Sequence, residues 1–186
     1  MDIKQLIIDF LNEKDIEEKI YNEFSLQFEL GIYLRERLPR WYKVEFERNI
    51  SHFAFLKSEF YKKEMDIVIY TEDKNEKYAI ELKQPRNGQV PEQMYHFLTD
   101  IAFVEQLKNS GFDKTFALEL TDDKHFWEGN DEGIYQYFRG NVPVKDVVYK
   151  PTGKGKDEEK IVLQREYTLE WKEIFKNSRY ILIEID

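Results

Sequence analysis

Apolar residues recur at helical spacing in the first part of the chain. They predict a short amphipathic helix over residues 2–12 and a longer helix that begins after Asp15 and ends before Pro39. The longer helix carries leucines along one face, and Glu23 and Gln27 lie on that same face, one turn apart. Because buried polar groups need partners, these two residues either meet partners in the core, lie at the margin of the stripe, or cap a break near Asn22.

The middle of the chain changes from helical spacing to alternation. Residues 41–48 alternate apolar and polar side chains, which is typical of a strand, whereas residues 49–62 are aromatic without a clean period and predict a strand or an irregular connection. Residues 65–71 and 78–83 then read as two strands joined by the polar turn 72–76. This stretch predicts a β-hairpin.

A second helical pattern follows the hairpin. Pro91 stands at the favoured first position of a helix over residues 91–109, and Ser110-Gly111 ends it. Residues 114–121 form the next predicted strand. A helix of this length permits a right-handed crossover between two parallel strands. We therefore expect an α/β fold with a mixed central sheet and helices on both faces.

The remainder of the chain is predicted to be rich in β-structure. Residues 122–141 are loop-like with a short helix near 134–138, residues 150–160 form a mobile surface loop, and residues 161–171 and 179–185 form two closing strands. We interpret residues 1–186 as a single domain, with a core over about 16–121 and a C-terminal β extension over about 142–186.

Composition limits what such a domain does. The 186 residues include no cysteine, which excludes disulfides and thiolate metal sites and fits a reducing cytoplasm. No apolar run approaches the roughly 18 residues of a membrane-spanning helix, so we expect no membrane association. The net charge of −9 counts against a protein that binds nucleic acid mainly through a basic surface.

The candidate chemistry lies in the hairpin. Because side chains alternate faces along a strand, Glu81 and Lys83 share one face, and Asp66 lies opposite the 81–83 segment if the turn centres near Lys74. Two carboxylates suit Mg²⁺, which prefers oxygen ligands, and a neighbouring lysine suits the placement of a water molecule. A cross-strand ion pair on a solvated face is the alternative interpretation.

The order αβββαβ, with Asp66 on one strand and Glu81-Leu82-Lys83 on the next, resembles the PD-(D/E)XK nuclease superfamily over about residues 16–121. Met65 stands where the motif name has proline. The resemblance implies a restriction-endonuclease-like fold and a nuclease that acts on DNA with Mg²⁺, or Mn²⁺ as a substitute.

The resemblance also implies roles for individual residues. Asp66, Glu81 and the backbone carbonyl of Leu82 would bind the metal, and Lys83 would orient or activate the water. Glu23, which we expect to be buried on the leucine stripe, is the first choice for a catalytic glutamate on the first core helix, with Glu29 as the second. Gln93 occupies the position of a glutamine that some members carry on the helix after the lysine strand.

Two other classes of function remain open from the sequence. A nuclease-like fold that serves as a catalytically inactive binding or scaffold subunit fits the acidic pI of about 5.0. An interaction protein whose sheet charges are ordinary ion pairs predicts that Glu81 and Lys83 point to bulk water. The sequence leaves open a homodimer or a larger complex.

Overall fold

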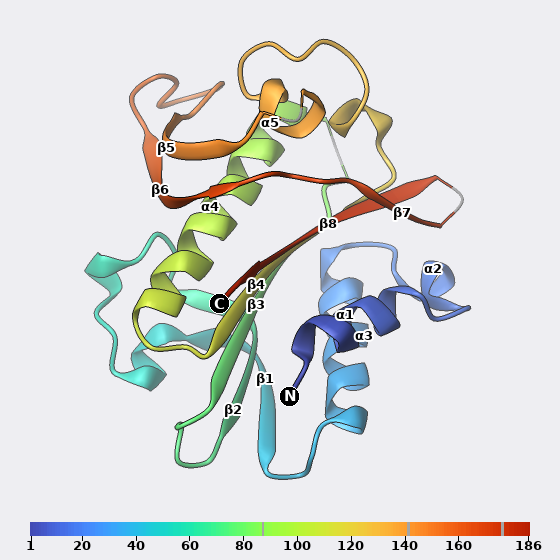
Figure 1. Cartoon of the computed structure of the whole chain (residues 1–186), viewed down its shortest axis with the longest axis vertical. Helices are drawn as coiled ribbons and strands as arrows, with labels where there is room; N and C mark the ends of the chain where they lie inside the picture. The colour runs from blue at the N-terminus through green and yellow to red at the C-terminus, as the bar shows by residue number, and fades with distance from the viewer. Residues whose placement is uncertain (87, 141, 176) are drawn as a thin grey trace.

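Six strands form one mixed sheet at the centre of the molecule, in the order β1-β2-β3-β4-β8-β7 (Figure 1). The computed structural model describes residues 1–86, 88–140, 142–175 and 177–186. The strands of this sheet are β1 (Tyr42–Asn49), β2 (Glu64–Thr71), β3 (Lys77–Lys83), β4 (Lys114–Thr121), β7 (Lys172–Phe175) and β8 (Ser178–Ile185). Among these six strands of the described ranges, β3 and β4 pair in parallel and the other neighbours pair antiparallel.

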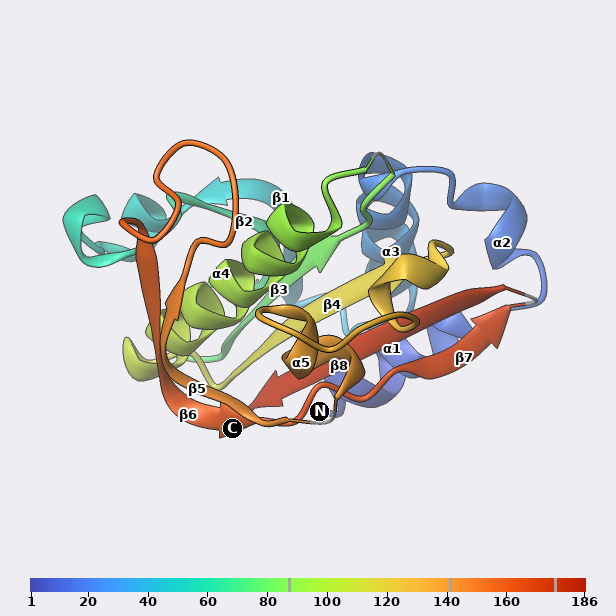
Figure 2. The same cartoon turned by 90° about the horizontal axis from the view of Figure 1, so that it is seen from above.

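Helices cover both faces of the sheet (Figure 2). On one face lie α1 (Ile3–Leu11), α2 (Ile16–Lys19) and α3 (Glu23–Arg37), and on the other lies α4 (Val90–Asn109). The α/β class with a mixed central sheet and flanking helices is therefore confirmed. The crossover prediction also holds, because α4 connects the two parallel strands.

The alternation of the hairpin strands divides their side chains between two cores. Ile67, Ile80 and Leu82 pack with the buried residues of α1 and α3. Val68 and Ala79, which point the other way, pack with Phe103 and Leu107 of α4 and their neighbours. Helix α4 thus covers one face of the hairpin. That face carries the even-numbered residues of β2 and the odd-numbered residues of β3.

The predicted helix between Asp15 and Pro39 is interrupted, which corrects the sequence analysis. Asp15 makes no side-chain capping bond, and α2 is only one turn long. The chain then extends, and Asn22 begins α3 through a capping box: its side chain accepts from the N–H of Ser25, and the Ser25 hydroxyl oxygen accepts from the N–H of Asn22. Capping residues, rather than the leucine spacing, decide where this helix begins.

The aromatic stretch after β1 was predicted to be a strand or an irregular connection, and it is an irregular connection. It contains the short 3₁₀ turns η1 (Ile50–Phe53) and η2 (Lys57–Glu59). After β4 come η3 (Lys124–Phe126) and the expected short helix, α5 (Tyr135–Arg139). A second, two-stranded sheet of β5 (Val144–Tyr149) and β6 (Lys160–Tyr167) lies against α4. The sequence analysis missed β5 and β7, and the strand predicted over 161–171 ends at Tyr167.

None of the helices within the described ranges has the length and apolar character needed to cross a lipid bilayer.

Candidate carboxylate–lysine site

The hairpin brings Asp66 and Glu81 face to face. The antiparallel register pairs Ile67 with Ile80, so the next residues along the two strands, Asp66 and Glu81, lie opposite each other. Each carboxylate accepts a hydrogen bond from the backbone of the other strand: the Leu82 N–H donates to Asp66 Oδ2 over 2.7 Å, and the Asp66 N–H donates to Glu81 Oε1 over 3.1 Å. The predicted proximity of these two carboxylates is confirmed.

Lys83 extends the same face of β3, and Glu23 reaches it from α3. The Lys83 Nζ and Glu23 Oε2 atoms are 3.1 Å apart, and the Gln84 N–H donates to the same oxygen over 3.0 Å. Glu23 is not buried on the leucine stripe, because its side chain is 44% exposed. The prediction of burial was wrong because α3 begins at Asn22, which leaves Glu23 in the first turn, beside the carboxyl end of β3.

Gln27, like the capping residue Ser25, is a buried polar residue of α3. Its side-chain amide donates to the backbone carbonyl of Asp66 over 2.7 Å and to Glu47 Oε1 over 2.6 Å. It therefore ties α3 to β2 and β1 immediately behind the site. Glu29 lies elsewhere, in a surface hollow with Phe10 and Glu13. Within the described residues, no hydrogen bond connects Gln93 to the site.

Three residues that the sequence analysis did not select complete the cluster. Lys62, just before β2, pairs with Glu81 Oε2, with Asp100 Oδ1 of α4 over 3.1 Å and with Asp66 Oδ1 at 4.0 Å. Glu119 of β4 lies beside Lys83 in the parallel register. Two signals point to the acids: Asp100 interrupts the apolar face of a helix, and Glu119 interrupts the apolar strand sequence KTFALELT.

Both acids are buried without a full set of partners. Asp100 is 4% exposed and Glu119 is fully buried. Across the described ranges, neither Glu119 oxygen has a hydrogen-bond partner, and the same is true of Asp100 Oδ2. Unpaired buried carboxyl oxygens are costly, so their presence beside Lys83 and Lys62 marks a region whose charge is incompletely balanced.

The pKa values of the carboxyl groups reflect this environment. Burial raises the pKa of Asp66 to about 6, against the opposing effects of Lys62 and of the Leu82 N–H. Burial, reinforced by the charge of Asp66, raises the pKa of Glu81 well above its ordinary range. Burial likewise raises the pKa of Asp100, and it raises the pKa of Glu119 well above its ordinary range. These carboxyl groups gain stability from protonation or from a nearby cation.

Both lysines stay charged. Burial lowers the pKa of Lys62, but the carboxylates of Glu81, Asp100 and Asp66 outweigh it, so the pKa is raised. Burial also lowers the pKa of Lys83, and Asp100 and Glu23 more than offset the effect. The site therefore holds two ammonium groups among five carboxyl groups, those of Glu23, Asp66, Glu81, Asp100 and Glu119.

The charged hairpin face is not solvated. Glu81 is fully buried and the Lys83 side chain is only 17% exposed. The interpretation in which Glu81 and Lys83 form an ordinary ion pair facing bulk water is therefore wrong.

The donor chemistry suits a hard divalent cation, because the oxygens of Asp66, Glu81 and Asp100 converge around one ammonium group. In the arrangement seen here, no three acidic or histidine side chains of the described segments are disposed to coordinate a metal. The carbonyl of Leu82 remains only a predicted ligand; the Leu82 contact that the structure records is the N–H bond to Asp66.

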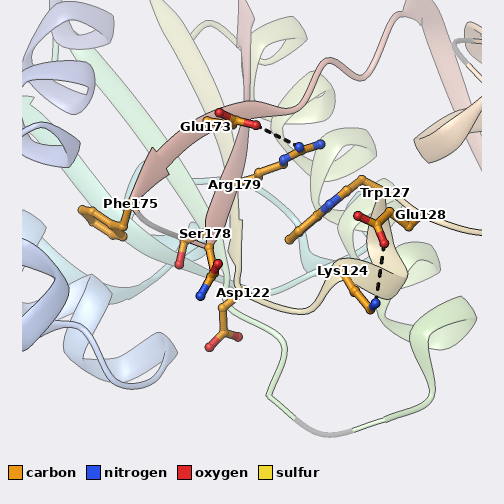
Figure 3. A pocket seen from close by; sticks show the side chains of 9 residues that line it. Asp122, Lys124, Trp127, Glu128, Glu173, Phe175, Ser178 and Arg179 are labelled. Carbon is orange, nitrogen blue, oxygen red and sulfur yellow. Dashed lines mark hydrogen bonds and ion pairs between the residues drawn. The ribbon is translucent and has the colours of Figure 1, made fainter.

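A surface pocket lies apart from the cluster, between η3 and the β7–β8 hairpin (Figure 3). Trp127 and Arg179 line it, with Arg179 over the indole ring and paired with Glu173 over 2.9 Å. A second hollow, lined by Tyr21, Gln84 and Arg86 among others, lies at the carboxyl ends of β3 and β4. The second hollow adjoins the candidate site through Gln84, whose N–H bonds to Glu23.

Comparison of the chain with models of protein families, with curated proteins and with solved structures found no match to any of them.

Proposed function

We propose that this protein is a Mg²⁺-dependent nuclease of the restriction-endonuclease-like fold that hydrolyses DNA phosphodiester bonds. The single observation that carries the proposal is the convergence of Asp66, Glu81 and Lys83 in one buried cluster. The strand order and the α4 crossover agree with the αβββαβ order of that fold.

The residues fit a divalent cation in their chemistry. Asp66 and Glu81 supply carboxylate oxygens from adjacent strands, and Asp100 supplies an oxygen without a hydrogen-bond partner among the described residues. A metal bound there would activate a water molecule and polarise a phosphodiester oxygen. Its positive charge would also balance the excess of carboxyl groups, which favours binding.

Lys83 is the residue that acts on the reacting groups. Its ammonium is held by Glu23 over 3.1 Å and stays protonated beside Asp100. A fixed positive charge in this position orients the attacking water and stabilises negative charge that develops on the phosphate oxygens. Glu23 is thus a positioning residue, since it contacts Lys83 and the Gln84 backbone.

Exposed aromatic side chains next to the cluster support a nucleic-acid substrate. Phe24 and Phe28 of α3 are 69% and 48% exposed, and their rings are stacked with centroids 6.4 Å apart. Each directly follows, along the helix, a residue that contacts the site: Phe24 follows Glu23, and Phe28 follows Gln27. Flat exposed rings stack with unpaired bases of any sequence. This stacking offsets part of the repulsion between the acidic protein and the DNA phosphates.

The test is cleavage of labelled single-stranded, duplex and branched DNA with Mg²⁺ or Mn²⁺. We expect Asp66→Asn and Lys83→Met to reduce the rate by about two orders of magnitude or more. Lys77→Met is the matched control, because Lys77 lies on the same face of β3 at its other end, and it should cleave at the wild-type rate. If the wild-type protein cleaves none of the three substrates with either metal, the catalytic proposal fails.

The alternative is a catalytically inactive nuclease fold that serves as a binding or scaffold subunit. The net charge of −9 and the filling of the carboxylate cluster by Lys62 favour it. Calorimetry with Mg²⁺ and Mn²⁺ separates the two functions, because a scaffold has no need of a divalent cation among these carboxylates. If the protein binds the metal but cleaves none of the three DNA substrates, both the nuclease function and the metal-free scaffold function are excluded.

A further inference from the structure

The Lys62 ammonium lies at the point where three carboxylates meet. It pairs with Glu81 of β3 and lies 3.1 Å from an oxygen of Asp100 of α4 and 4.0 Å from an oxygen of Asp66 of β2. The three acids come from three different elements, whereas Lys62 belongs to the irregular segment between η2 and β2. One ammonium group thus links β2, β3 and α4.

The carboxylates are largely buried in the core, whereas the lysine reaches them from the surface. Glu81 is fully buried and Asp100 nearly so, and Asp66 is held by the Leu82 N–H. The Lys62 side chain is 31% exposed and enters the cluster from the surface. Buried carboxylates require a counterion, and the structure meets this requirement with the ammonium of a long, flexible side chain.

We propose that the Lys62 ammonium occupies the position of the divalent cation, and that Lys62 must swing outward before the metal binds. Asp100 then becomes the third carboxylate around the metal, beside Asp66 and Glu81. The inference rests on the proposed function, because it describes how the metal site of that function is controlled.

Electrostatics makes the two states exclusive. An ammonium that contacts Glu81 and Asp100 leaves no room for a second cation between the same oxygens, and two cations at contact distance repel each other. Lys62 therefore serves as an internal competitor: its charge balances the carboxylates of the metal-free protein and lowers the apparent affinity of the site for the metal.

The first test is a calorimetric titration of metal-free protein with Mn²⁺. We expect Lys62→Met to bind Mn²⁺ about tenfold more tightly than wild type, because the competing state is removed. Lys63→Met is the matched control, since Lys63 is the exposed neighbour, and its affinity should equal that of wild type. An affinity of Lys62→Met equal to or weaker than that of wild type overturns the inference.

The second test uses the wild-type chain and so does not depend on the folding of a variant. Lysines are reductively methylated with and without saturating Mn²⁺, and peptide mass spectrometry compares Lys62 with Lys63. We expect Lys62 to be modified more slowly than Lys63 in the metal-free protein and several-fold faster once Mn²⁺ is bound. An unchanged or lower Lys62 rate with Mn²⁺ contradicts the inference.

The two tests distinguish this inference from the function on which it rests. If neither the wild-type protein nor Lys62→Met binds Mn²⁺ or Mg²⁺, the metal-dependent function is refuted, and the inference with it. If both bind the metal equally and Lys62 stays protected, the metal site stands and Lys62 is only a permanent structural counterion.

Discussion

The Glu81 side chain accepts a hydrogen bond of 3.1 Å from the backbone N–H of Asp66, so the two acids of the candidate site are tied to each other's strands. The reciprocal bond, from the Leu82 N–H to Asp66, is 2.7 Å long. The two carboxylates are consequently held by backbone N–H groups of the hairpin itself.

This arrangement separates the structural role of Asp66 from its charge. Asp66→Asn keeps an oxygen that can accept from the Leu82 N–H, so we expect its free energy of unfolding to lie within about 1 kcal/mol of wild type. Asp66→Ala leaves the Leu82 N–H without this partner, and its free energy of unfolding should be lower than that of wild type by about 1–3 kcal/mol. Both variants should lose Mn²⁺ binding. Denaturant unfolding and calorimetry measure these effects, and retention of wild-type metal affinity by Asp66→Asn would count against Asp66 as a ligand.

Gln27 holds the site from behind, and its loss should destabilise the fold. Gln27→Leu leaves the Asp66 carbonyl and the Glu47 carboxylate without their donor, which should lower the free energy of unfolding by about 1–3 kcal/mol. Glu29→Gln, on the same helix but away from the site, should change it by no more than about 0.5 kcal/mol. Urea unfolding of the two variants compares them directly; equal stabilities would show that the Gln27 bonds contribute nothing net.

Glu119 should make the metal-free protein less stable as the pH rises. Its pKa is raised in the folded state by burial, so between the ordinary value of 4.5 and the raised value the folded protein holds a proton that the unfolded chain has released. In that window the stability falls with increasing pH. The side chain of Glu119→Gln cannot ionise. The free energy of unfolding of this variant should therefore rise, relative to that of wild type, by about 1.4 kcal/mol per pH unit in this window.

The measurement is chemical unfolding at a series of pH values in the presence of a chelator. Near pH 4, where the wild-type carboxyl is protonated, the two proteins should be similar in stability. A constant difference across the pH range would mean that Glu119 has an ordinary pKa and a cation partner.

The stacked rings of Phe24 and Phe28 should contribute to substrate affinity and hardly at all to stability. Replacing both with alanine should weaken binding to single-stranded DNA by about 1–3 kcal/mol for each base that stacks, while the free energy of unfolding changes by only about 0.5 kcal/mol at exposed positions. Fluorescence anisotropy with a labelled oligonucleotide and Mg²⁺, in a Lys83→Met background that prevents cleavage, gives the affinity. Tyr149→Ala, an exposed aromatic change on β5, is the control and should leave the affinity unchanged.

The elements of the fold were largely predictable, and the exceptions have identifiable causes. Alternation and turn chemistry located β1, β2, β3 and β4, and Pro91 located the start of α4, because these signals are local. The helix predicted from Asp15 to Pro39 was broken by the capping preference of Asn22 and Ser25, which competes with the leucine spacing. The strand β7 was missed because four residues carry too little pattern.

The sequence by itself determined that Asp66, Glu81 and Lys83 share one face of the hairpin. The turn sets the register of the hairpin, and the two-residue period of a strand places all three side chains on one face. Only the tertiary structure decided that Lys62, Asp100 and Glu119 belong to the same cluster. It also decided that, of the two polar residues Glu23 and Gln27, Gln27 is the buried one. These residues come from separate elements, and their proximity depends on how α3 and α4 pack against the sheet, which no local periodicity encodes.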